Sequence, residues 1–334
     1  MAACMVSTGR TRVRGYGRAV ALALLVSVCG ILGTRALGLP PYPGLHLLRL
    51  CRHAARTVSA AVHRRLILRR TSSWLSAGEG RLQVIYTAPD ADIVPVIASY
   101  AERAWDAVAR ELGFSGAAVP TLILSPSFRE LGHCFGEGAA ASSVGMYRAG
   151  VVGMVSPRAW GGVFGRDEAT DPFELYNPLH HEFCHYVLEE MTDGNCPSWF
   201  SEGVAQLMER RATGYACYDA RTAGGASVLA AAPALVDLDR ALYSEDGMPA
   251  AYLKSLWAAE RLMSVLGRDG FGRLTGLLRE GIAFDDALRE VAGASCSELD
   301  REWGEWVRGA LRGREGTGAK TVEQTSGGSG TLGS

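Results

Sequence analysis

Residues 179–188 read LHHEFCHYVL and contain an HExxH pattern formed by His181, Glu182 and His185. Two His residues four positions apart lie one turn apart on the same face of a helix. Neutral imidazoles at this spacing can bind one Zn²⁺, and Glu182, beside the first of them, can take a proton from a water that attacks a carbonyl. The pattern therefore predicts His181 and His185 as zinc ligands and Glu182 as a general base.

The flanking residues predict two helices joined by a tight turn. Asn177 can be the N-cap of the first helix and Pro178 its first helical residue. The run DGNCP at residues 193–197 ends this helix, and PSWFSEGVAQ at residues 197–206 predicts a second one. The first helix climbs about 12 Å after its second His, and the second helix returns about 7.5 Å. An antiparallel pair would place Glu202 near both His residues, as a third zinc ligand that leaves a fourth position to water.

Other zinc layouts fit this stretch less well. The HExxHxxGxxH layout requires Gly at position 188 and His at position 191, where the chain has Leu188 and Met191. His180 points about 100° away from His181 on a helix, so it is not expected to be a ligand. A surface helix that bears two unrelated His residues, with no metal, is the remaining alternative.

The whole stretch from residue 179 to residue 206, LHHEFCHYVLEEMTDGNCPSWFSEGVAQ, resembles the gluzincin metallopeptidases and most of all the peptidase-MA-like group. The resemblance implies Zn²⁺ held by His181, His185 and Glu202, with Glu182 as the catalytic base. It also implies an α+β, zincin-like fold over residues 80–312, in which a small mixed sheet with helices precedes a mostly helical subdomain. Many gluzincins have an acidic residue four positions after the ligand Glu, and this chain has Gln206 there.

Two weaker expectations follow from the same resemblance. Residues 151–156 occupy the place of an edge strand that could hold a peptide substrate by backbone pairing. Tyr252 stands where the family often has a Tyr, and its hydroxyl could donate to the oxyanion of the transition state as a catalytic group. The alternatives are an ordinary core strand and a Tyr that only packs within a helix.

Hydrophobic periodicity in the rest of the chain agrees with an α+β fold. Strands are predicted at residues 81–87 and 121–124, with an amphipathic helix at residues 93–112 between them. Residues 143–148 and 151–156 predict a hairpin. Helices dominate after residue 175, and the predicted segments are 257–266, 271–278, 284–291 and 299–311.

Charge divides the chain into two parts. The first 70 residues contain twelve Arg and no Asp or Glu, whereas the remainder has 22 basic and 35 acidic residues. An acidic bulk argues against nucleic acid as a partner, because nucleic-acid binding requires a basic face. Residues 1–18 are a basic tail, and residues 19–39 predict an uncleaved signal anchor, with a cleaved signal peptide as the alternative. Four Arg precede the apolar run, so the N-terminus is expected inside and the remainder outside the cytoplasmic membrane.

Two further segments flank the expected catalytic domain. Residues 40–79 predict a basic amphipathic helix and a linker, and this helix could lie on the membrane surface or pack on the domain. Residues 313–334 are polar and rich in Gly and Ser, which predicts a disordered tail.

The sequence therefore predicts a single-pass, membrane-anchored zinc metallopeptidase that acts on peptide or protein substrates outside the cytoplasmic membrane. The alternative function is a zinc-bound but non-catalytic extracellular domain that binds a partner. The presence of Glu182 favours the enzyme, because a metal site that only binds has no need of a base.

Overall fold

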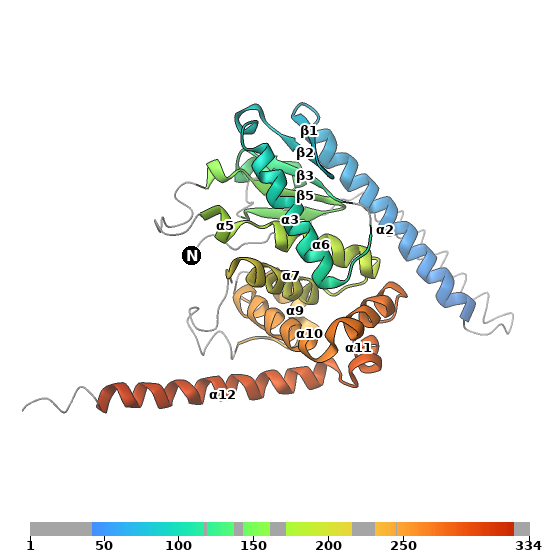
Figure 1. The fold of residues 1–334 in the computed structure, drawn as a ribbon. Coiled ribbons are helices and arrows are strands. Elements are labelled where there is room, and N and C mark those ends of the chain that lie inside the picture. The colour runs from blue at the N-terminus through green and yellow to red at the C-terminus, as the bar shows by residue number, and fades with distance from the viewer. Residues whose placement is uncertain are drawn as a thin grey trace, which may run out of the picture.

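The computed structural model describes residues 42–116, 119–136, 143–160, 172–215, 231–244 and 246–323. The predicted basic tail at residues 1–18 and the predicted signal anchor at residues 19–39 lie outside these ranges. Among the described residues, no helix has both the length and the apolar content needed to cross a membrane. The fold is α+β, as predicted, because a mixed sheet with helices is followed by a mostly helical part (Figure 1).

The sheet has five strands in the order β1-β2-β3-β5-β4. The pairs β2–β3 and β3–β5 are parallel, whereas β1–β2 and β4–β5 are antiparallel. The predicted strands and the predicted hairpin are confirmed with shifts of one or two residues. The strands are β1 (Leu75–Glu79), β2 (Leu82–Tyr86), β3 (Thr121–Ser125), β4 (Gly145–Arg148) and β5 (Val151–Val155).

Strand β1 lies in the segment that the sequence predicts as a linker. It pairs with β2 from Leu75 opposite Tyr86 to Glu79 opposite Leu82. Gly80, with a φ of 58°, supplies the left-handed conformation that the tight turn between the two strands requires. The folded part therefore begins before residue 80.

The expectation that residues 151–156 form an edge strand is wrong. Strand β5 pairs with β3 on one side and with β4 on the other, so β4 is the outer strand. The turn at Ala149 and Gly150, both with positive φ, folds β4 back against the outer side of β5. The hairpin was recognisable from the sequence, but its placement in the sheet depends on the distant strand β3.

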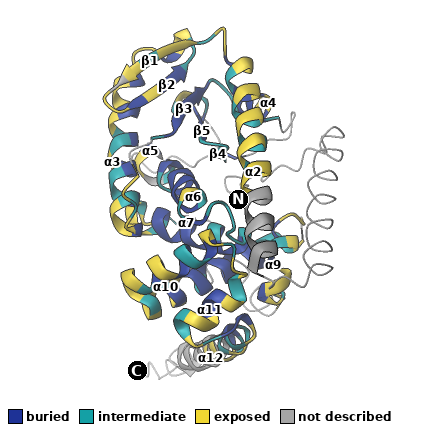
Figure 2. Cartoon of the chain, turned by 90° about the vertical axis from the view of Figure 1, so that its right-hand side faces the viewer, coloured by how far each residue is buried: buried dark blue, intermediate teal, exposed yellow. Residues whose placement is uncertain are grey.

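Helices cover both faces of the sheet (Figure 2). One face packs against α3 (Val94–Leu112) and α6 (Leu179–Thr192), and the other packs against α4 (Phe128–Phe135). Strand β3 is buried along its whole length. Helix α3 buries one stripe of apolar residues in the same core, namely Val94, Ile97, Ala101, Ala104, Trp105, Val108 and Leu112. Helix α6 packs against this core through its contacts with α3, β4 and β5.

The basic helix α2 (Tyr42–Arg70) packs on the domain near its C-terminal end. Ile67 is buried in the main core. The guanidinium of Arg64 donates to the carbonyl of Gly150 at 2.9 Å and to Oγ1 of Thr121 at 3.1 Å. Arg70 donates to the carbonyl of Cys134 at 3.1 Å. Packing on the domain, one of the two alternatives for this helix, is therefore observed.

The second half of the chain is helical, as predicted. Helix α10 is interrupted at Gly267, whose φ of 60° and ψ of −169° separate the two predicted segments 257–266 and 271–278. Helix α12 continues through residues 313–323 of the segment predicted to be a disordered tail, so the prediction is wrong for these residues; residues 324–334 lie outside the described ranges. The helices are α7 (Ser198–Thr213), α9 (Leu235–Ala241), α10 (Met248–Arg279), α11 (Phe284–Ala292) and α12 (Cys296–Glu323).

Candidate metal centre

Helix α6 carries the HExxH residues, and its packing fixes their direction. Phe183, at the centre of the buried stripe, meets Trp105 of α3 edge-on with ring centroids 5.7 Å apart. Leu179 and Val187, one turn before and one turn after, are fully buried on the same stripe. Because this stripe faces the sheet and α3, the neighbouring face, with His181 and His185, is turned toward α7.

The start of α6 differs from the prediction. Pro178, not Asn177, occupies the N-cap position, and no side chain caps the helix. The Asn177 amide instead donates to the carbonyls of Phe173 and Glu174 at 3.1 and 3.3 Å. Both carbonyls belong to the short helix α5 (Pro172–Tyr176), so Asn177 closes the end of that helix.

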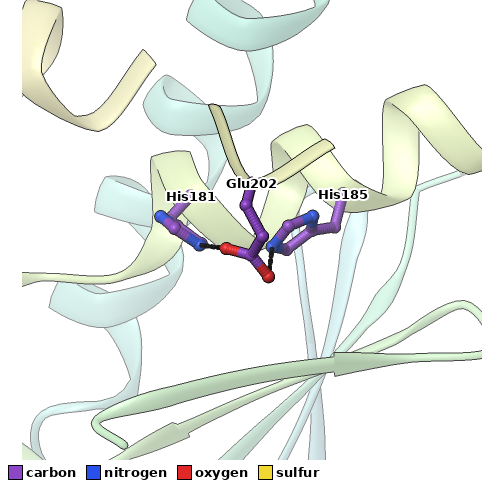
Figure 3. Close-up of side chains that lie close together, drawn as sticks. All are labelled: His181, His185 and Glu202. Atoms are coloured by element: carbon purple, nitrogen blue, oxygen red, sulfur yellow. Dashed lines mark ion pairs between the residues drawn. The ribbon is translucent and has the colours of Figure 1, made fainter. Parts of the chain in front are cut away.

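Helix α7 returns alongside α6 and brings Glu202 between the two His residues (Figure 3). Oε2 of Glu202 lies 3.3 Å from Nε2 of His181, and Oε1 lies 3.6 Å from Nε2 of His185. One ligand atom from each residue lies within 4.8 Å of the others. The three residues that the sequence predicts as ligands thus form one group that could hold a metal ion.

Four buried polar atoms at this point lack a well-aligned hydrogen-bond partner. They are Nε2 of His181, Nε2 of His185, Oε2 of Glu202 and Oε2 of Glu182. The 3.3 Å approach of His181 to Glu202 is an ion-pair distance rather than a good hydrogen bond. Unpartnered buried polar groups are costly, and a cation among them would satisfy both imidazoles and the carboxylate. The donor atoms therefore fit a metal ion.

The electrostatics of the group favour a positive charge between its members. Burial by itself lowers the pKa of His181, but its interactions with the carboxylates of Glu202 and Glu209 together outweigh burial and raise that pKa well above 6.5. Burial likewise raises the pKa of Glu202, yet the two His residues and a hydrogen bond from Tyr252 together hold it below 4.5. Burial lowers the pKa of His185 to about 4, which keeps this imidazole neutral.

Each imidazole also has a partner at its other nitrogen. Nδ1 of His181 lies 3.3 Å from Oε2 of Glu209, and Nδ1 of His185 lies 2.8 Å from Oγ of Ser201. Such partners orient a His ligand and direct its free nitrogen toward a metal. The sequence reasoning missed both of them. Glu209 follows Glu202 by seven residues, two helical turns, and that spacing was the available signal.

Gln206 does not take the place of the acidic residue seen in many gluzincins. Its Nε2 donates to the backbone carbonyls of Glu202 and Tyr252, at 3.2 and 3.1 Å. Gln206 therefore connects α7 to α10. The carboxylate that contacts Nδ1 of His181 comes from Glu209 instead.

Tyr252, the predicted oxyanion donor, is buried, and its hydroxyl donates a hydrogen bond to the carboxylate of Glu202. Helix α10 can approach this closely because residue 203 is glycine. A Cβ at Gly203 would overlap the backbone carbonyl of Ser255. Tyr252 thus contacts a candidate ligand, and its role toward an oxyanion stays a prediction.

Glu182 faces a cavity of about 200 Å³ that the candidate ligands His185 and Glu202 also line. Burial raises the pKa of Glu182 to about 8, and the nearby carboxylates add to this effect while His181 opposes it. A Cβ at Gly145 on β4 would meet both Pro178 and the Glu182 carboxylate, so glycine makes room for the carboxylate at this point. Glu182 is therefore placed beside the candidate metal site with a pKa suited to proton transfer.

Strand β4 forms the opposite wall of this cavity. Tyr147 lies over His185, with ring centroids 6.4 Å apart and planes 26° from parallel. Its hydroxyl accepts from the amide of Gly150 at 3.2 Å and forms a hydrogen bond with Glu189. No local sequence pattern points to Tyr147 as a site residue, because its position depends on how the hairpin packs against α6.

His180, which the sequence reasoning set aside, does not belong to the group. It is half-buried, and burial lowers its pKa to about 4.

No model of a known protein family matches this chain, and no curated protein sequence matches it either.

Proposed function

We propose that the chain is a membrane-anchored zinc metallopeptidase of the gluzincin type, with a zincin-like domain outside the cytoplasmic membrane. One observation carries the proposal. His181, His185 and Glu202 converge with unpartnered buried atoms, and Glu182 faces the same cavity.

The donor set supports zinc as the metal. Two imidazoles and one carboxylate are a typical protein ligand set of catalytic zinc sites, which leave a fourth position for water. When bound, zinc would polarise the carbonyl of the scissile peptide bond and make a water molecule more acidic. The partners at the outer nitrogens, Glu209 and Ser201, support His181 and His185 as its ligands.

The position of Glu182 beside the cavity and its raised pKa support a role as the general base. Its carboxylate would take a proton from the water as the water oxygen bonds to the carbonyl carbon. The same proton would pass to the amine nitrogen as the carbon–nitrogen bond breaks, so the carboxylate is restored. Tyr147 and Met146 of β4 bound the cavity on one side and would limit the water that reaches the reacting groups from there.

An extended peptide is the substrate that the surroundings favour. Strand β4 is the outer strand of the sheet in the described part of the chain, and two of its residues line the cavity. Unpaired backbone groups of an outer strand can pair with an extended peptide. The four Arg that precede the apolar run, at positions 10, 12, 14 and 18, support a domain outside the membrane that residues 19–39 would anchor.

Two single substitutions test the mechanism. Glu182→Gln keeps all three candidate ligands, so zinc content should persist while hydrolysis of a casein or peptide-library substrate falls by about 10²-fold or more. Glu202→Gln replaces an anionic ligand by a weaker neutral one, so zinc content and thermal stability should both fall.

The outcomes separate the peptidase from its alternative. Both variants should be inactive, and elemental analysis should find only Glu202→Gln poor in zinc. If the wild type hydrolyses the substrate and Glu182→Gln does so equally well, the mechanism is wrong. If zinc is bound but no substrate is cleaved, the result favours a zinc-bound, non-catalytic binding domain.

A further inference from the structure

Helix α2 has an apolar face that points away from the domain. Val58, Val62 and Leu66 follow one another at four-residue intervals and are 61%, 37% and 41% exposed. The exposed Ala54, Ala55 and Ala61 extend the same face. In Figure 2, where α2 lies on the side nearest the viewer, the described part of this helix is largely exposed. A continuous exposed apolar face indicates an interaction site more than an ordinary solvated surface.

Among the described side chains of α2, the contacts with the core and the sheet come from the opposite face of the helix. Ile67 enters the core, and Arg64 donates to Gly150 and Thr121. Nearer the N-terminus of α2, Nδ1 of His53 lies 2.9 Å from a carboxylate oxygen of Asp193, at the end of α6. Two separated anchoring points fix the rotation of α2 about its axis. The fold therefore holds this apolar face outward, with Val58 mostly exposed and Val62 and Leu66 more than a third exposed.

The charge on this helix selects the partner. The sequence of α2 contains no acidic residue, and Arg65 and Arg69 are exposed on the same outward face as Val62 and Leu66. A second copy of α2 would bring Arg residues together with no carboxylate to pair with them. Anionic lipid headgroups offer both the negative charge and the apolar layer beneath it. The helix also follows the apolar run at residues 19–34 in the sequence.

We infer that α2 lies along an anionic membrane surface. Val58, Val62 and Leu66 enter the apolar layer below the headgroups, while Arg65 and Arg69 extend to the lipid phosphates. The inference rests on α2 and on no assumption about peptide hydrolysis.

One consequence concerns the candidate metal centre. A cavity of about 500 Å³ lies between the inward face of α2, at Ala60 and His63, and the end of α6. Glu189 and Gly194 line both this cavity and the one beside Glu182. With α2 on the membrane, about one helix diameter of 10–12 Å would separate this cavity from the lipid. If the proposed peptidase activity is correct, its substrates are chain segments close to the membrane surface.

Photo-crosslinking of the full-length protein tests the inference. Benzoylphenylalanine is placed at Val58 or at Val62, and for comparison at Val236 of α9, which is 76% exposed and apolar. Each protein is irradiated in vesicles of phosphatidylcholine with phosphatidylglycerol. Mass spectrometry should find lipid adducts at positions 58 and 62 and few at position 236. Unchanged thermal unfolding shows that each variant is folded.

The other outcomes contradict the inference. Crosslinked dimers at positions 58 and 62 would identify a second copy as the partner, and adducts equal to those at position 236 would show no preferred lipid contact. The double variant Arg65→Gln with Arg69→Gln should lower the adduct yield at position 62 several-fold when phosphatidylglycerol is present. An unchanged yield would show that the Arg residues do not contact the lipid headgroups.

Discussion

Glu209 lies two turns of α7 beyond Glu202, and its Oε2 is 3.3 Å from Nδ1 of His181. The two carboxylates contact the two nitrogens of one imidazole, because residues seven positions apart share a helix face. With Glu209 accepting from Nδ1, the lone pair of Nε2 is left for a metal. One face of α7 therefore supplies both a candidate ligand, Glu202, and the carboxylate of Glu209, which orients a second candidate ligand, His181.

Glu209→Ala should weaken zinc binding. Loss of a carboxylate that orients a His ligand typically lowers metal affinity by about 10- to 100-fold. Competition with a chromogenic chelator measures the change. Glu260→Ala is the matched control, because Glu260 forms an exposed ion pair with Arg210 on the outer side of the helices. Equal zinc affinity in Glu209→Ala and the control would show that Glu209 does not support the metal.

Tyr252→Phe distinguishes two roles for this hydroxyl. The hydrogen bond to Glu202 predicts that the variant loses zinc affinity by roughly tenfold, with a smaller change in kcat once zinc is saturating. The oxyanion role predicts the reverse, with zinc affinity intact and a fall in kcat of about 10²-fold. Zinc titration followed by kinetics at saturating zinc separates the two results.

Gly203→Ala should destabilise the protein, although alanine normally favours a helix. The added methyl group would overlap the carbonyl of Ser255 and push α10 away from α7. Overpacking of this kind costs about 1–3 kcal/mol, measured by urea denaturation. The control Gly272→Ala, with open space around its Cβ, should be neutral or more stable by up to about 1 kcal/mol. A stabilised Gly203→Ala would show that the two helices are not closely packed there.

Glu182 should make the metal-free protein less stable as the pH rises. Burial raises its pKa in the folded state to about 8, from the usual 4.5. Between these values the folded state binds more protons than the unfolded state, so the free energy of unfolding falls as the pH increases. Glu182→Gln does not titrate and should be more stable than the wild type at pH 8, by on the order of 2–4 kcal/mol.

Thermal unfolding of both chelator-treated proteins across this pH range checks the prediction. At pH 4.5 and below, Glu182 is protonated in the folded state, so the difference between the two proteins should largely disappear. A difference that stays constant with pH would mean that it arises from packing and not from the charge of Glu182.

Local sequence patterns were sufficient to predict those features of the fold and of the candidate site that depend on one element or on two elements adjacent in the chain. The spacing of His181 and His185 places both on one helix face, and the DGNCP turn returns the chain so that Glu202 reaches them. The spacing of apolar residues predicted the helix at residues 93–112 and the hairpin at residues 143–156. This spacing is also a local property, because it depends on residues within one helix or within two strands that are adjacent in the sequence.

Only the tertiary structure determined the positions of residues that reach the site from elements distant in the sequence. Tyr147 reaches His185 only because β4 is the outer strand, and that place is set by β5 pairing with β3. Tyr252 reaches Glu202 only because α10 packs closely on Gly203. Helical and strand periodicity identify the buried face of an element but not its partner. The choice of partner follows from the packing of the whole core, which no local pattern contains.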